Sequence, residues 1–143
     1  MKRQNDYLRL MLDVTKTITA SLDPTDKFEL IVSRIPQVTG VDAATIRLLD
    51  PEGRKLILKA ASGLSEAYLN RGPIDAEESV LSALAGTPIA VYDAANDPRI
   101  RYPEAARQEG IKSILVAPIP IRGKINGILR LLTRTHREFD PLE

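Results

Sequence analysis

The stretch "APIPIRGKINGILRL", residues 117–131, decides the fold. Two apolar runs flank the turn-forming residues "RGK", so the stretch predicts a β-hairpin. Pro118 and Pro120 stand two apart in its first strand, where backbone N–H groups two residues apart point to the same edge. Because proline has no N–H to donate, both lost donors fall on one edge. We therefore expect a strand that is fully paired on one side only, with the prolines protecting its other edge against a further strand.

The rest of the chain predicts helices and strands around this hairpin. Apolar residues three and four apart predict two opening helices, and Gly40 is a natural stop after the second. The expected elements are helices over 6–20 and 21–40, a hairpin over 42–63, a helix over 75–86, a strand over 87–93 and a short helix over about 103–109. This order predicts an α+β fold on a mostly antiparallel sheet, in a single domain over residues 1–143.

Composition narrows the class of protein. The chain has 143 residues, of which 43% are hydrophobic and 27% charged, and its net charge is +1. No apolar run approaches the roughly 18 residues of a membrane span, and no signal peptide precedes the first helix, so we expect a cytoplasmic protein without membrane contact. Few aromatic residues accompany the basic ones, so we expect no nucleic acid partner. The absence of cysteine excludes disulfides, thiolate catalysis and cysteine–zinc sites.

Catalytic patterns are missing from the sequence. The chain has one histidine, no "GxSxG", no phosphate-binding glycine loop and no cluster of metal ligands, so we expect no enzymatic activity, no catalytic residues and no metal site. Glu77 and Glu78 are a carboxylate pair, but adjacent helix residues do not converge on one point. We expect both to lie exposed in the first turn of a helix.

Two arginines stand out in the expected strands. Arg47 in "ATIRLL" and Arg130 in "GILRLL" are each the lone charge among apolar neighbours. Two interpretations remain open. The pair could clamp a carboxylate or phosphate, because each guanidinium forms bidentate hydrogen bonds. Alternatively, each could lie over the sheet edge or pair with Asp42, Asp50 or a helix carboxylate, with only its stem buried.

The connection "YDAANDPRIRY", residues 92–102, is the other candidate for ligand binding. Its Asp93, Arg99 and Tyr102 are candidate contacts, because binding residues often lie on loops held by a rigid scaffold. Ser79, early in the expected helix over 75–86, is a further candidate. The same residues also suit ordinary turn and cap hydrogen bonding, and both interpretations stay open.

The first helix carries a heptad-like apolar stripe. We expect a homodimer through this stripe, which consists of Leu8, Met11, Thr15, Ile18 and Leu22. The alternative is an amphipathic helix that packs wholly on its own sheet.

Several segments together resemble the GAF domain family. They are "TGVDAATIRLLDPEGRKLILKAASGL", "AGTPIAVYDAANDPR" and "EGIKSILVAPIPIRGKINGILRLL". The most specific pieces are Gly86-x-Pro88, Asp93 with the following "DPR", Gly110-x-x-Ser113, and Gly123 with Gly127 in the closing hairpin. The resemblance spans about residues 8–140, with an N-terminal signalling helix over about 6–20 and a core over about 23–140.

The resemblance implies both a fold and a role. The fold is a central antiparallel sheet of about five to six strands, related to that of PAS domains, with helices on one face and ligand-pocket loops on the other. The role is a sensor in bacterial signalling proteins, such as two-component histidine kinases and transcription regulators, which binds a small molecule and signals to an effector domain through dimerising terminal helices. The chain is expected to be an excised part of such a protein. The alternatives are a dimerisation and relay module without a ligand and, with less support, an enzyme.

The resemblance also bears on cofactors, and the ligand itself stays unknown. Bilin-binding members attach the pigment through cysteine, and methionine sulfoxide reductases of this fold need cysteines, so the sequence excludes both. The cyclic GMP-binding pattern of the family is not matched, because Thr133 and Arg134 stand where asparagine and lysine are expected. His136, in the polar "TRTHREFD", is expected to be a surface residue rather than a haem ligand.

Overall fold

The computed structural model describes residues 24–74 and 77–139. The expected first helix over 6–20 and its stripe, Leu8, Met11, Thr15, Ile18 and Leu22, lie outside the described residues. The helices are α2 (Pro24–Thr39), α3 (Glu66–Leu69), α4 (Glu78–Leu84) and α5 (Pro103–Glu109). The strands are β1 (Ala43–Leu49), β2 (Leu56–Ser62), β3 (Ile89–Val91), β4 (Ser113–Ile121) and β5 (Lys124–Thr133).

The five strands form one antiparallel sheet in the order β2-β1-β5-β4-β3. The expected α+β fold with an antiparallel sheet of five to six strands is therefore confirmed, with five strands in the described part of the chain. Both predicted hairpins are present, as β1–β2 and β4–β5. The middle strand, β5, pairs with β1, so two segments that are far apart in the sequence lie side by side in the sheet.

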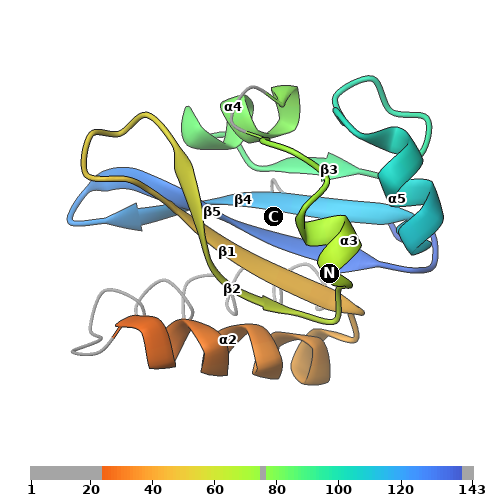
Figure 1. Cartoon of the computed structure of the whole chain (residues 1–143), viewed down its shortest axis with the longest axis horizontal. Helices are drawn as coiled ribbons and strands as arrows, with labels where there is room; N and C mark the ends of the chain where they lie inside the picture. The colour runs from red at the N-terminus through yellow and green to blue at the C-terminus, as the bar shows by residue number, and fades with distance from the viewer. Residues whose placement is uncertain (1–23, 75–76, 140–143) are drawn as a thin grey trace.

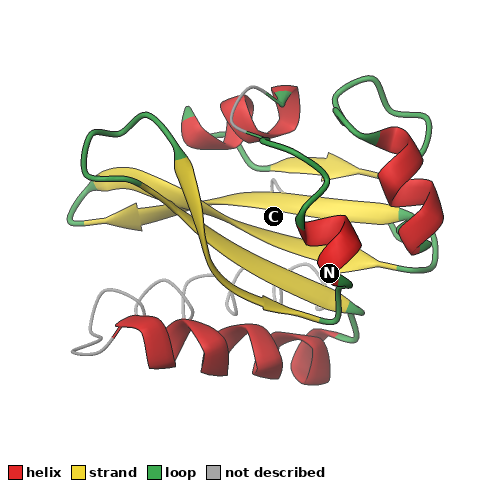
Figure 2. Ribbon diagram, in the orientation of Figure 1, coloured by secondary structure: helices red, strands yellow, loops and turns green. Residues whose placement is uncertain are grey.

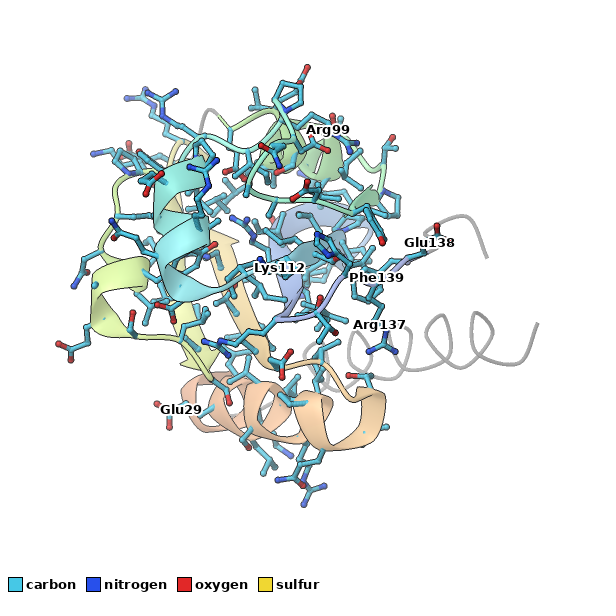
Figure 3. The ribbon with its side chains drawn as sticks, turned by 90° about the vertical axis from the view of Figure 1, so that its right-hand side faces the viewer. Glu29, Arg99, Lys112, Arg137, Glu138 and Phe139 are labelled. Atoms are coloured by element: carbon cyan, nitrogen blue, oxygen red, sulfur yellow. The ribbon has the colours of Figure 1, made fainter. Side chains whose placement is uncertain are left out.

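Helices cover both faces of the sheet (Figures 1 and 2). Helix α2 packs on β1 and β2 through Phe28, Ile31, Val32 and Ile35, which are buried. The shorter helices α3, α4 and α5 lie over the opposite face, where α4 contacts β4 and β5. Figure 3 shows this division from the side, with Glu29 on α2 and Arg99 across the sheet from it. None of the helices in residues 24–74 and 77–139 combines the length and the apolar character of a membrane span.

The paired prolines lie where the sequence predicts an incompletely paired edge. Strand β4 pairs with β5 along its whole length, whereas its pairing with β3 runs only from Ile114 to Val116. Pro118 and Pro120 follow beyond that point. In the described part of the chain, the β3-side edge of β4 therefore has no partner strand along the prolines, which agrees with edge protection.

The covering layer departs from the sequence expectation in two places. Helix α3 was not expected, because four residues are too few to show helical periodicity; the Ser65 hydroxyl caps it by accepting a hydrogen bond of 3.1 Å from the N–H of Tyr68. Helix α4 begins at Glu78, with Glu77 in the N-cap position, rather than at residue 75. The short helix after β3 has the expected bounds, Pro103–Glu109.

Candidate functional site

The candidate site lies on the face of the sheet covered by α3, α4 and α5. Thr45 pairs with Arg130, and Arg47 pairs with Ile128, in the ladder between β1 and β5. Residues two apart on a strand share a face, so all four side chains project to the same side. Arg47 and Arg130 stand diagonally across the ladder, a separation that long side chains bridge easily. The two arginines singled out in the sequence therefore meet on one face.

Arg130 is deeply buried and pairs with a carboxylate. Its side chain is 1% exposed, and its Nη1 lies 3.4 Å from Oε2 of Glu77, an ion-pair distance. Among residues 24–74 and 77–139, none of its three nitrogens, Nε, Nη1 and Nη2, has a hydrogen-bond partner. A guanidinium carries five N–H donors, and buried donors are normally satisfied. Arg130 thus presents a charged, unsatisfied donor group inside the protein.

Glu77 is the carboxylate that faces this guanidinium. It is 2% exposed, so the expectation that it lies in an exposed first turn is wrong. Its Oε1 accepts a hydrogen bond of 3.0 Å from the backbone N–H of Arg101, and its Oε2 accepts one of 2.7 Å from the Ser79 hydroxyl. The neighbouring Glu78 is exposed, as expected. Burial of Glu77 is compensated by the ion pair with Arg130 and by these two donors.

A second arginine adds positive charge to the same place. Arg47 is 6% exposed, and its Nη1 donates a hydrogen bond of 3.2 Å to the hydroxyl of Thr45. Burial, followed by the positive charges of Arg130 and Arg71, lowers the pKa of the Arg47 guanidinium to about 10. Even so, Arg47 is charged at neutral pH. The guanidiniums of Arg130 and Arg71 are therefore close enough to act electrostatically on that of Arg47.

Arg71, between α3 and α4, is the third member, and we call Arg47, Arg71 and Arg130 the arginine cluster. The Nη1 of Arg71 donates a hydrogen bond of 2.8 Å to the carbonyl oxygen of Tyr68, and the guanidinium carbon of Arg71 lies 4.0 Å from the centroid of the Tyr68 ring. This is a cation–π contact. Burial lowers the pKa of Arg71 as well, and the charge of Arg130 acts in the same direction. Within the described residues, neither Arg47 nor Arg71 forms an ion pair.

Charge in the cluster is unbalanced. In the part of the chain that the structure describes, Glu77 supplies the one carboxylate that acts on the three guanidiniums: it pairs with Arg130, and its negative charge opposes the lowering of the pKa of Arg47 and Arg71. The surrounding face is apolar, with Val80, Ile114, Val116 and Ile128 fully buried. Unbalanced like charges in such surroundings are costly, and an anion that supplies oxygen acceptors would relieve both the charge and the unmet hydrogen bonds.

Tyr102 contacts the segment between α3 and α4 that carries Arg71. Its hydroxyl donates a hydrogen bond of 2.6 Å to the carbonyl oxygen of Pro73, and its ring centroid lies 5.9 Å from the Arg71 guanidinium carbon. Gly72 makes this approach possible, because a Cβ there would lie 2.4 Å from the Tyr102 hydroxyl oxygen, and because its φ of +137° disfavours other residues. Tyr102 therefore fixes the segment that carries Arg71.

The other predicted site residues do not join the cluster directly. Ser79 is linked to it through Glu77, whose Oε2 accepts the hydrogen bond of the Ser79 hydroxyl. Arg99 is bound to Asp97 by hydrogen bonds of 3.0 and 2.7 Å, and this pairing lowers the pKa of the Asp97 carboxyl. The Asp93 carboxylate accepts a hydrogen bond of 2.8 Å from the side-chain amide of Asn96. Arg99 and Asp93 thus have local structural partners, the turn role that the sequence left open.

The remaining candidates for cofactor or metal binding are also placed. His136 is exposed, as expected, and stacks on Tyr92 with ring centroids 5.0 Å apart. The described part of the chain holds no group of three or more histidine, aspartate or glutamate side chains suited to a metal ion.

A second group of polar contacts connects helices α3 and α5 with the end of the sheet. Glu109, at the end of α5, accepts hydrogen bonds from the Ser65 N–H (2.8 Å) and hydroxyl (2.6 Å) and pairs with Arg134 at 3.2 Å. Burial alone would raise the pKa of Glu109, but the Ser65 and Arg134 donors outweigh it, and the pKa is lowered overall. Arg134 also donates 3.0 Å to the carbonyl oxygen of Gly63. These contacts hold α3, and with it the segment that carries Arg71, over the sheet.

Sequence reasoning missed two members of the site. Arg71 follows α3 in an irregular segment, where no periodicity marks a buried side. Glu77 is one of two adjacent carboxylates, and only its contact with Arg130, far along the chain, distinguishes it from Glu78. Local sequence carries no signal for either residue.

Comparisons with known proteins agree on the fold. The model of the family described as "GAF domain" matches residues 23–143. No curated protein matches the sequence. Among solved structures, the GAF domain of a phosphoenolpyruvate-protein phosphotransferase from Coxiella burnetii has a TM-score of 0.70 at 22% identity, covering 93% of this chain and 80% of that one.

Two further solved structures represent different activities. A domain of a two-component sensor histidine kinase protein from Sinorhizobium meliloti has a TM-score of 0.67 at 23% identity and covers 84% of this chain and 79% of that one. The free methionine-R-sulfoxide reductase of Neisseria meningitidis, solved with its substrate, has a TM-score of 0.68 at 17% identity and covers 94% and 77%. Similarity at this level of identity extends to the fold alone.

Proposed function

Because the chain belongs to the GAF domain family, whose members are typically sensory and regulatory, we propose that it is a non-catalytic sensor that binds a small anion at the arginine cluster. The observation that carries this proposal is the Arg130 guanidinium, which is 1% exposed and whose nitrogens have no hydrogen-bond partner in the described part of the chain. A carboxylate or phosphate group matches this geometry, since each accepts paired hydrogen bonds from guanidinium. A neutral ligand would leave the positive charges unbalanced.

The absence of cysteine supports a regulatory role over the reductase activity of one structural neighbour. That neighbour is a methionine sulfoxide reductase, and thiol chemistry requires cysteine, of which this chain has none. The alternative proposal is a relay module without a ligand. The fully buried apolar residues around the cluster, among them Val80 and Ile128, favour that alternative, because they pack the covered face tightly.

Substitutions in the cluster separate these two proposals. Arg47→Ala and Arg130→Ala are each expected to weaken binding of inorganic phosphate or of a small carboxylate by about tenfold or more, because each removes charged hydrogen bonds to the anion. Isothermal titration at constant ionic strength gives the affinities. Arg54→Ala is the matched control, because the Arg54 side chain is 78% exposed on the β1–β2 turn. Unchanged affinity in both cluster variants, or no binding by the wild-type protein in a panel of anions, contradicts the sensor proposal.

Signal output is proposed to run through a homodimer formed by the stripe Leu8, Met11, Thr15, Ile18 and Leu22, toward an effector domain in a cytoplasmic signalling protein such as a histidine kinase or transcription regulator. These residues recur at heptad spacing, which is typical of a parallel helical seam. Substituting Leu8 and Met11 together by glutamate is expected to convert a dimer into a monomer in sedimentation velocity. Ala20→Glu, off the stripe, is the control and should leave the dimer intact. A wild-type monomer contradicts this part of the proposal.

A further inference from the structure

Glu77 presents its carboxylate to Arg130, the group that an anionic ligand of the arginine cluster would also bind. We propose that Glu77 is an internal counter-ion: it neutralises part of the cluster in the empty protein, and an incoming anion displaces it from Arg130. This inference rests on the proposed function, since it concerns the regulation of the same site. It assigns Glu77 the role of setting both the affinity for the anion and the structural response to it.

The contacts of Arg130 support displacement. Glu77 Oε2 stands 3.4 Å from Arg130 Nη1 and makes no hydrogen bond to it, while the same oxygen accepts a 2.7 Å bond from the Ser79 hydroxyl. The carboxylate is thus hydrogen-bonded to Ser79 and to the Arg101 N–H, and it is only paired electrostatically with Arg130. A carboxylate or phosphate whose oxygens accept hydrogen bonds directly from the guanidinium nitrogens would hold Arg130 more strongly than Glu77 does.

Charge in the cluster supports competition. Glu77 acts electrostatically on Arg47 and Arg71 as well as pairing with Arg130. Its negative charge therefore repels any anion that approaches the cluster, in a region where burial weakens screening. Removing that charge while preserving the shape of the side chain should tighten anion binding.

The partners of Glu77 connect the site to the covering layer. Glu77 precedes α4, its Oε1 binds the backbone N–H of Arg101 at 3.0 Å, and the N–H of Ser79 approaches the carbonyl oxygen of Arg99 at 3.5 Å. Arg101 directly precedes Tyr102, the N-cap residue of α5. Displacement of Glu77 would change the contacts of both α4 and the segment that leads into α5. The two arrangements, Glu77 on Arg130 and anion on Arg130, form the bistable element that a sensor requires.

The test compares Glu77→Gln with Glu78→Gln. Inorganic phosphate is the probe, with chloride balancing ionic strength, and its dissociation constant is measured by isothermal titration and by the shift of melting temperature with phosphate concentration. We expect Glu77→Gln to bind phosphate at least tenfold more tightly than wild type. Glu78→Gln removes the same charge from the exposed neighbour and is expected to bind as wild type does. Equal or weaker binding by Glu77→Gln overturns the counter-ion role.

A second variant covers the case in which Glu77→Gln does not fold. Glu77→Asp keeps the charge but withdraws the carboxylate by one methylene, and it should bind phosphate more tightly than wild type, by a smaller factor than Glu77→Gln. Wild-type affinity in Glu77→Asp overturns the counter-ion role in that case.

Displacement itself has a spectroscopic readout. In wild type, the amide NMR signal of Arg101 should shift as phosphate saturates the site, because its hydrogen bond to Glu77 changes. An Arg101 signal that stays fixed at saturation overturns displacement. If wild type binds phosphate and Glu77→Gln binds it with the same affinity, the counter-ion role alone is contradicted. If no variant binds phosphate or a carboxylate, the proposed function is contradicted as well.

Discussion

Replacing Glu77 with alanine is expected to lower the free energy of unfolding by about 3–5 kcal/mol, because it leaves buried guanidinium groups without their counter-charge. Arg130 is 1% exposed and has Glu77 as its ion-pair partner. The same substitution removes the acceptor for the Arg101 N–H and for the Ser79 hydroxyl. Urea denaturation of the variant and of wild type measures the difference.

Adding Arg130→Met to Glu77→Ala is expected to recover most of that loss. Methionine fills a similar volume without a charge, and apolar replacements for buried ion pairs are often neutral or stabilising. Arg130→Met alone should therefore cost much less than Glu77→Ala, since it also relieves repulsion from Arg47 and Arg71. Glu78→Ala, on the exposed neighbour, should stay within about 0.5 kcal/mol of wild type. A loss of equal size in Glu77→Ala and Glu78→Ala would contradict a stabilising role for the buried ion pair between Glu77 and Arg130.

Gly127→Ala is expected to destabilise the protein by about 3 kcal/mol, because the added methyl group collides with a neighbouring strand. A Cβ at Gly127 would lie 2.2 Å from the carbonyl oxygen of Arg47 and 3.0 Å from the Cα of Leu48. Both are backbone atoms of β1, so the clash cannot be relieved by turning a side chain. Since β1 and β5 carry Arg47 and Arg130, their displacement should also weaken phosphate binding.

Gly53→Ala is the control for Gly127→Ala. Gly53 lies in the β1–β2 turn with a φ of +71°, and a Cβ there meets nothing within 4 Å. This variant should lose only the roughly 1–2 kcal/mol that a left-handed conformation costs a residue with a side chain. Thermal denaturation of both variants gives the comparison. A smaller loss in Gly127→Ala than in Gly53→Ala would contradict the close approach of β1 and β5.

The sheet was predictable because its signals are local. Alternating and continuous apolar runs mark the hairpins, and the spacing of Pro118 and Pro120 alone indicates that one edge of β4 lacks a partner, as the structure confirms. Helix α3 was not predictable, since one turn leaves no periodic pattern.

The candidate site was predictable only in part, for a related reason. Arg47 and Arg130 are conspicuous as charges inside apolar strands, and strand pairing brings them to one face. Arg71 and Glu77 become members of the site only through contacts with distant parts of the chain. The exposed position expected for Glu77 followed from its local pattern, which Glu78 shares.

The pairing of β1 with β5 affects the order in which the protein folds during synthesis. During synthesis on the ribosome, β1 emerges long before β5, which is its neighbour in the folded sheet. Until β5 is synthesised, the edge of β1 that pairs with it has no partner. Closing so long a loop is slow compared with forming a hairpin, which makes this pairing a late event in folding. Arg130 arrives with β5, so a nascent chain has no complete arginine cluster until almost the whole domain has been synthesised. The arginine cluster is therefore completed only when β5 joins β1.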